Sequence, residues 1–181
     1  MNPSSNLFLV GPSGAGKTSI GRRLAEHYAL TFLDLDREIE THTGVDVATI
    51  FEIEGEAGFR QREAALLAEC SGGAGVLLAT GAGAVLDADS RRHLRERGFV
   101  IWLQASVEQQ LERLSRDKQR PLLAGVDRRQ RLAAMAATRD PLYRELADLV
   151  VPGRHEHVAP ACMRALQMLD AHWQRAHGQP A

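Results

Sequence analysis

The sequence predicts an α/β fold in which a five-stranded parallel sheet is flanked by helices, and three observations predict this class. Short apolar runs alternate with longer amphipathic stretches, as expected when helices cover both faces of a parallel sheet. There are five such runs, which favours an open sheet over an eight-stranded barrel. A length of 181 residues suits one domain with its own core. We therefore expect a single domain over residues 1–181.

Each strand is predicted from a short apolar run bounded by polar residues or glycine. The five runs are 7–10, 31–34, 75–80, 99–103 and 149–151. Amphipathic spacing predicts helices over 17–28, 58–70, 90–97, 107–116, 128–138 and 158–175. Two segments, 36–58 and 118–127, break the alternation. We expect both to be irregular and to extend beyond the carboxyl edge of the sheet, where open parallel sheets bind their ligands.

Charge and cysteine content bear on the class of partner and the compartment. The formal net charge is −1, so the overall balance indicates neither a nucleic-acid partner nor an anionic membrane surface. The two cysteines lie far apart and lack metal-site spacing, as is typical of a reduced protein. The first residues contain no basic segment followed by a long apolar one. We therefore expect a cytoplasmic protein with no nucleic acid and no membrane among its partners.

The segment GPSGAGKT at 11–18 is the strongest functional signal. It matches G-x-x-x-x-G-K-[ST], and it stands directly after a predicted strand and opens a predicted helix. Glycines let successive backbone N–H groups face an anion, and the helix N-terminus adds the positive end of its dipole. Lys17 is expected to bind the β- and γ-phosphates, and the hydroxyl of Thr18 is expected to bind Mg²⁺. The segment therefore predicts a purine nucleoside triphosphate with Mg²⁺.

The residues alone define the phosphate acceptor less sharply. Asp34 and Asp36 would share one face if their strand continued, so that one could organise the Mg²⁺ shell while the other accepts a hydroxyl hydrogen bond. Farther along, Arg60 stands among glutamates in IFEIEGEAGFRQRE. It could bind a carboxylate through a bidentate fork, or it could belong to an ordinary surface ion-pair network. The chain lacks the N-K-x-D guanine signature, so a small transferase is favoured over a switch GTPase.

Taken together, these motifs resemble the shikimate kinase family, in the nucleoside-monophosphate-kinase-like branch of P-loop proteins. The resemblance covers nearly the whole chain and rests on GPSGAGKT at 11–18, D-x-D at 34–36, F-x-x-x-G-E-x-x-F-R-x-x-E at 51–63, TGAGAV at 80–85, RPLL at 120–123 and R-x-P-L-Y at 139–143. It implies a substrate-binding region at about 34–62 and a lid at about 115–127. It also implies a monomer that transfers the γ-phosphate of ATP, its co-substrate, to the 3-hydroxyl of shikimate in aromatic amino acid biosynthesis.

The resemblance further implies roles for individual residues. The catalytic set is Lys17, Asp36 and Arg120. The nucleotide-binding set is Gly14, Ala15, Gly16, Lys17, Thr18, Ser19, Arg113, Arg120 and Arg154. The shikimate-binding set is Asp36, Arg60, Gly81, Ala82, Gly83 and Arg139. Thr18 and Asp34 are the implied Mg²⁺ residues. Ala82 departs from the family, which usually has glycine there; alanine would be strained if the position needed a positive φ, and tolerated otherwise.

Two other functions remain open. A gluconate kinase would share the phosphate loop and the size, and its carboxylate substrate would also suit Arg60 and Arg139, but the motif at 51–63 favours shikimate. A non-catalytic ATP-binding module would differ in class. The intact residues Lys17, Thr18, Asp34, Asp36 and Arg120 argue against such a degenerate kinase.

Overall fold

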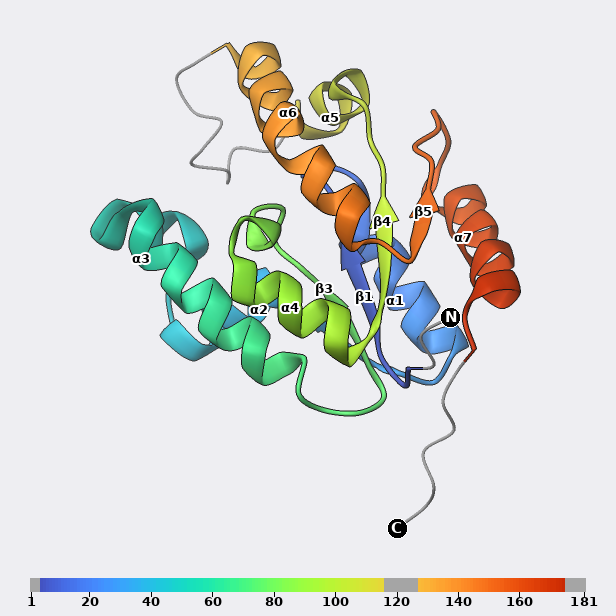
Figure 1. Ribbon diagram of the computed structural model, residues 1–181. Helices are drawn as coiled ribbons and strands as arrows, with labels where there is room; N and C mark the ends of the chain where they lie inside the picture. Colours follow the sequence, from blue (N-terminus) through green and yellow to red (C-terminus); the bar gives the residue numbers. More distant parts are fainter. Residues whose placement is uncertain (1–3, 116–126, 175–181) are drawn as a thin grey trace.

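The computed structural model describes residues 4–115 and 127–174, and it places five parallel strands in one sheet between two helical layers (Figure 1). The strand order is β2-β3-β1-β4-β5. The strands are β1 (Leu7–Val10), β2 (Thr31–Asp34), β3 (Val76–Ala79), β4 (Phe99–Leu103) and β5 (Leu149–Val151). The helices are α1 (Lys17–His27), α2 (Leu35–Thr43), α3 (Val47–Cys70), η1 (Ala84–Leu86), α4 (Ala88–Arg97), α5 (Val107–Leu114), α6 (Arg128–Leu146) and α7 (Val158–His172). The predicted fold class is confirmed.

Alternate residues of the central strand β1 enter cores on opposite faces of the sheet. Leu7 and Leu9 pack with residues of α1 and α7, whereas Phe8 and Val10 pack with residues of α2, α3, α4 and α6. All four side chains are fully buried. Because a parallel strand in the middle of such a sheet is covered on both faces, its sequence is a continuous apolar run rather than an alternating one.

The prediction of an irregular segment at 36–58 is wrong. This segment forms α2 and the first part of α3. Asp46 begins α3 by accepting a hydrogen bond from the backbone N–H of Thr49, at 2.7 Å. The helix bends at Gly55, whose φ of 70° and ψ of −176° are not helical. Gly55 and Asp46, which suggested a loop, therefore form a kink and a cap of helix α3.

Two further helical boundaries differ from the predictions. Helix α6 continues to Leu146, past the predicted end at 138, with Pro141 inside it. Helix α5 begins at Val107 as predicted but ends at Leu114 rather than at 116, and it starts with a capping box, in which Ser106 and Gln109 bond to each other's backbone N–H groups. The predicted lid at about 115–127 lies almost wholly outside the described residues, and so does Arg120. Among the described helices, none is both long and apolar enough to cross a membrane.

Candidate active site

The phosphate loop joins β1 to α1, and three of its positions require glycine. Gly11, Gly14 and Gly16 have φ values of 140°, 78° and 93°, which side chains with a Cβ rarely adopt. A Cβ at Gly11 would also overlap the carbonyl oxygen of Leu103 at the end of β4. The loop is therefore held close to the carboxyl edge of the sheet, with α1 directed away from it.

Lys17 lies along this loop. Its Nζ donates hydrogen bonds to the carbonyl oxygens of Gly11 and Pro12, at 2.7 and 2.9 Å. These bonds place the ammonium beside the loop, where it is close to any phosphate that the loop binds.

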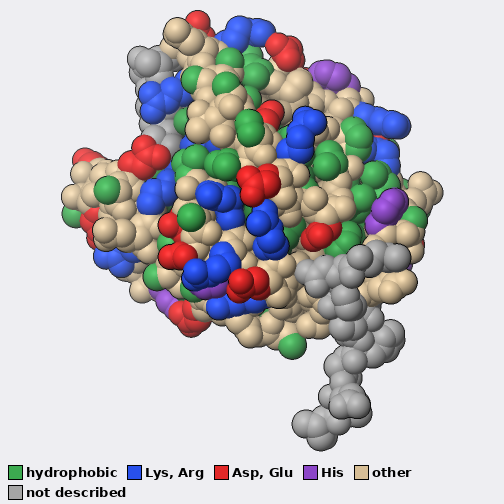
Figure 2. All heavy atoms as spheres, viewed as in Figure 1, with side chains coloured by type: hydrophobic (Ala, Val, Ile, Leu, Met, Phe, Trp, Pro, Cys, Tyr) green, Lys and Arg blue, Asp and Glu red, His purple; other side chains and the backbone are tan. Residues whose placement is uncertain are grey.

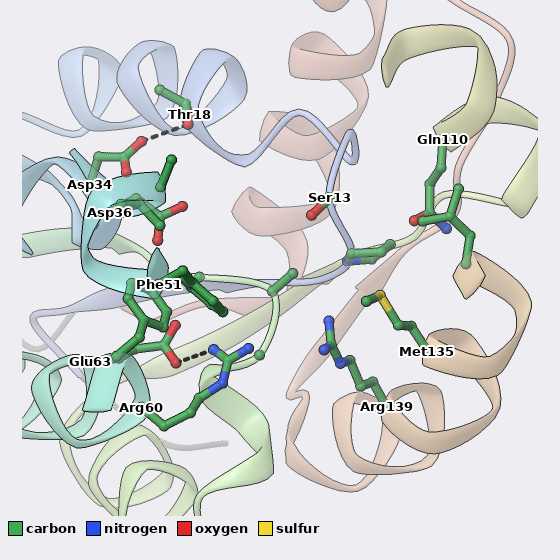
Figure 3. A pocket seen from close by; sticks show the side chains of 18 of the residues that line it. Ser13, Thr18, Asp34, Asp36, Phe51, Arg60, Glu63, Gln110, Met135 and Arg139 are labelled. Atoms are coloured by element: carbon green, nitrogen blue, oxygen red, sulfur yellow. Dashed lines mark hydrogen bonds and ion pairs between the residues drawn. The ribbon is translucent and has the colours of Figure 1, made fainter. Parts of the chain in front are cut away.

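Thr18 and Asp34, the two residues predicted to bind Mg²⁺, lie next to each other. The hydroxyl of Thr18 donates to Oδ2 of Asp34 at 2.6 Å (Figure 3). Asp34 is the last residue of β2 and precedes α2, while Asp36 lies in the first turn of that helix. The two aspartates therefore do not share a strand face, because the strand ends at Asp34. Both nevertheless line one cavity.

Two cavities flank the phosphate loop. The first, with a volume of about 500 Å³, lies among α2, α3 and α6, and Pro12 and Ser13 contribute to its wall. The predicted residues that line it are Thr18, Asp34, Asp36, Arg60, Gly81, Ala82, Gly83 and Arg139. The second, of about 590 Å³, lies among the loop, α5 and the segment after β5. The predicted residues that line it are Gly14, Ala15, Gly16, Ser19, Arg113 and Arg154. We call them the acceptor cavity and the nucleotide cavity.

In the acceptor cavity, Arg60 is held by carboxylates of its own helix. Its guanidinium bonds to Oε2 of Glu63 at 2.5 Å and to Oε1 of Glu56 at 3.3 Å. The Glu63 side chain is only 2% exposed. Burial raises the pKa of Glu63, partly offset by the charge of Arg60. Arg60 thus lies in the cavity wall and also makes ion pairs with Glu56 and Glu63, and its role as a carboxylate ligand stays a prediction.

Arg139 enters the same cavity from the opposite side, on α6 (Figure 3). It is 9% exposed, and no carboxylate among residues 4–115 and 127–174 lies within ion-pair distance of it. Burial lowers the pKa of Arg139, and the nearby charge of Arg60 lowers it further. Two guanidinium groups thus face one cavity, where an anion would offset their charges.

The backbone at Gly81–Gly83 forms another wall of the acceptor cavity. A Cβ at Gly81 would overlap Oε1 of Glu63 and lie 3.2 Å from Oδ1 of Asp36. A Cβ at Gly83 would overlap the guanidinium of Arg60. Ala82 does not have a positive φ, because Ala29 alone does so among the described residues other than glycine. The alanine is therefore accommodated without backbone strain, whereas a Cβ at either neighbour would displace the side chain of Glu63 or Arg60.

The arginines of the nucleotide cavity are more exposed than those of the acceptor cavity. Arg113 and Arg154 are both exposed, and Arg113 donates to the carbonyl oxygens of Gly14 and Arg154, at 2.8 and 3.4 Å. Arg164 of α7 supports the segment after β5 through a bond to the carbonyl oxygen of Pro152, at 2.7 Å, and an ion pair with Glu156. These two arginines of the predicted nucleotide-binding set thus lie together beside the phosphate loop.

Several side chains of the acceptor cavity had no assigned role in the sequence. Phe51 and Phe59 pack against each other with ring centroids 4.6 Å apart, and both line the cavity. Met135 and Tyr143 line it from α6. The spacing of Arg139 and Tyr143 by one helical turn could have indicated a shared face, but only with α6 correctly extended past 138.

A phosphate loop lies between two cavities, one lined by exposed arginines and one by buried charged side chains. This arrangement is that of a P-loop kinase.

The chain belongs to the shikimate kinase family, whose model matches residues 13–170. A shikimate kinase of Stenotrophomonas maltophilia (strain R551-3) is 53% identical over 175 residues, covering 97% of each chain. One of Methylococcus capsulatus is 54% identical over 156 residues, covering 86% of this chain and 87% of that protein. The solved structure of the shikimate kinase from Acinetobacter baumannii in complex with shikimate has a TM-score of 0.89 and 44% identity, covering 93% and 94% of the two chains.

A more distant similarity is limited to the fold. A gluconokinase from Sinorhizobium meliloti superposes with a TM-score of 0.56 at 17% identity, covering 93% of each chain. At this identity the likeness shows that the two proteins share an architecture, and it does not show a shared substrate.

Proposed function

We propose that the protein transfers the γ-phosphate of ATP to the 3-hydroxyl of shikimate, giving shikimate 3-phosphate and ADP. The observation that carries the proposal is the pair of guanidinium groups, Arg60 and Arg139, that face one cavity beside the phosphate loop. Shikimate is a carboxylate, and a carboxylate between two arginines offsets charges that otherwise repel each other in a buried site.

The other walls of the acceptor cavity suit the rest of shikimate. The carboxylate of Asp36 accepts hydrogen bonds from ring hydroxyls, and it orients the attacking hydroxyl or takes its proton. The backbone of Gly81, Ala82 and Gly83 lies close enough to Glu63 and Arg60 to complete the wall. Phosphoryl transfer requires mainly that the reacting groups are positioned and that their charge is neutralised. These contacts would position the acceptor.

On the nucleotide side, the phosphates of ATP lie along Gly11–Thr18, where the amides and Lys17 neutralise their charge. We assign Arg113 and Arg154 to the adenine, because both line the nucleotide cavity. Arg120 is proposed to reach the transferred phosphate, and it lies outside the described residues.

Thr18 and Asp34 would hold Mg²⁺. Both present hard oxygen atoms beside the phosphate loop, and their 2.6 Å hydrogen bond shows that the two groups can meet at one point. When bound, Mg²⁺ would neutralise charge on the phosphate oxygens. The chain's own contribution is to hold the hydroxyl and the carboxylate together at the end of β2. We also propose that the enzyme acts in the cytoplasm, where its two free cysteines would stay reduced, and as a monomer, as the family resemblance implies.

The test is ADP release from ATP and Mg²⁺ with shikimate, gluconate, quinate or no acceptor, using the intact protein and the Lys17→Ala variant. We expect release that depends on shikimate and is lost in the variant. Release with gluconate alone would overturn the acceptor assignment while retaining a kinase. If no acceptor supports release although ATP binds, the protein is a binding module.

A further inference from the structure

Tyr143 ends the R-x-P-L-Y motif, and neither the sequence nor the proposed reaction gives it a role. Its side chain is fully buried on α6, one helical turn after Arg139. Its hydroxyl donates a hydrogen bond to the backbone carbonyl oxygen of Ala82, at 2.5 Å. The same helix therefore supplies an arginine to the acceptor cavity and a hydrogen bond to the Gly81–Gly83 wall of that cavity.

The hydrogen bonds of the Gly81–Gly83 segment give this contact its importance. The carbonyl of Gly81 accepts from the N–H of Ala84, at 3.2 Å, and that of Gly83 from the N–H of Leu86, at 2.9 Å. Both bonds are local. The carbonyl of Ala82 instead bonds to a residue 61 positions away in the sequence. The Tyr143 hydroxyl thus links the middle of this segment to α6.

Fixing one carbonyl also fixes the neighbouring amide. In a trans peptide the carbonyl of Ala82 and the N–H of Gly83 belong to one plane and point in opposite directions. Gly83 packs so closely on Arg60 that a Cβ there would overlap the guanidinium. The peptide between Ala82 and Gly83 therefore has its carbonyl bonded to the Tyr143 hydroxyl, and the Cα that follows it lies against Arg60.

We propose that Tyr143 is a positioning residue for the acceptor carboxylate: its hydroxyl fixes the position of the Ala82–Gly83 peptide relative to the two arginines, Arg60 and Arg139. The inference rests on the proposed function. The ring is itself well fixed, because it packs on Trp102 with centroids 5.7 Å apart. Burial raises the pKa of Tyr143, which keeps the hydroxyl protonated and able to donate.

The experiment replaces each of the chain's two tyrosines by phenylalanine. Tyr143→Phe keeps the ring and its packing and removes only the hydroxyl. Tyr28→Phe is the matched control, because the Tyr28 hydroxyl bonds to Asp170 at 2.7 Å and lines neither cavity. We expect Tyr143→Phe to raise the KM for shikimate about fivefold to tenfold, with the KM for ATP unchanged. Tyr28→Phe should alter neither value.

A second measurement separates positioning from general support of the fold. We would compare binding of shikimate and of its methyl ester by calorimetry. If the hydroxyl positions the carboxylate site, Tyr143→Phe weakens binding of the acid but hardly that of the ester, and it accelerates hydrogen exchange at the Gly83 amide. Equal weakening of both ligands together with a higher KM for ATP would show a merely structural role and overturn the inference.

The remaining outcomes are also decisive. A wild-type protein that does not phosphorylate shikimate overturns the proposed function itself. A wild-type protein that does so, with a Tyr143→Phe variant whose shikimate KM and ester preference are unchanged, overturns only the role of Tyr143. Should the variant prove unstable, hydrogen exchange of wild type can still decide: a Gly83 amide that exchanges as fast as an exposed loop amide contradicts a fixed peptide.

Discussion

The two cavities beside the phosphate loop differ in how their charges are held. In the acceptor cavity, Arg139 is 9% exposed and Glu63 is 2% exposed. The glycines there let side chains approach the backbone so closely that a Cβ would overlap them. In the nucleotide cavity, Arg113 and Arg154 are exposed. Figure 2 shows that positive and negative side chains also mix on the face of the molecule that it draws.

This difference indicates how much the charged side chains of each cavity should contribute to affinity and selectivity. A buried charge has lost much of its water and depends on its ligand, so its removal is costly. An exposed charge is screened, and its removal costs little. We therefore expect the acceptor to be recognised by a rigid set of buried groups. We expect the nucleotide to be recognised chiefly by the backbone of the phosphate loop, with exposed arginines adding less.

The largest effect should come from Arg139→Ala. Because the side chain is buried in the acceptor cavity and has no carboxylate partner among the described residues, the substrate carboxylate is its natural counter-ion. We expect kcat/KM for shikimate to fall about 100-fold or more, with little change in ATP affinity. Steady-state kinetics with each substrate varied in turn would measure both.

The matched control for this variant is Arg131→Ala, an exposed arginine on the same helix α6. It should leave both kinetic constants within about twofold of wild type. If Arg139→Ala and Arg131→Ala behaved alike, the buried guanidinium would not be a substrate ligand, and the contrast between the two cavities would lose its main support.

A smaller effect is expected from Gly83→Ala. The added methyl group would overlap the Arg60 guanidinium, so the arginine must move away from its position in the cavity. Such overpacking costs about 1–3 kcal/mol, and we expect the KM for shikimate to rise about tenfold. Gly73→Ala is the control, because its Cβ would meet only Val76 at an ordinary 3.6 Å. A Gly83→Ala enzyme with a normal KM would show that this close approach is not needed.

The sequence predicted the parts of the molecule whose signals are local. Strand β1 and the phosphate loop are examples, since a continuous apolar run and a glycine pattern each define a structure without reference to the rest of the chain. The placement of Arg60, Gly83 and Arg139 in one cavity needed the family resemblance, because their helices and loop meet only through the tertiary fold.

The errors have physical causes of the same kind. Residues 36–58 contain charged side chains and Gly55, which in isolation favour a loop. The segment is helical because Leu35, Ile39 and Ile50 are buried against the sheet, and the kink at Gly55 lets the chain turn without ending the structure. The bond from Tyr143 to Ala82 was missed for a related reason, since no sequence periodicity connects a helix to a carbonyl 61 residues away.

The smallest effect should come from Arg113→Ala in the nucleotide cavity. The guanidinium is exposed and donates to the carbonyls of Gly14 and Arg154, so its loss removes one screened charge and two solvated hydrogen bonds. An exposed charge contributes about 0–1 kcal/mol, so we expect the KM for ATP to rise only about twofold to threefold, with the shikimate KM unchanged. Raising the salt concentration should reduce even this difference. A loss of ATP affinity as large as the effect of Arg139→Ala on shikimate would mean that Arg113 becomes buried when the nucleotide binds, and the nucleotide cavity would then resemble the acceptor cavity in its working state.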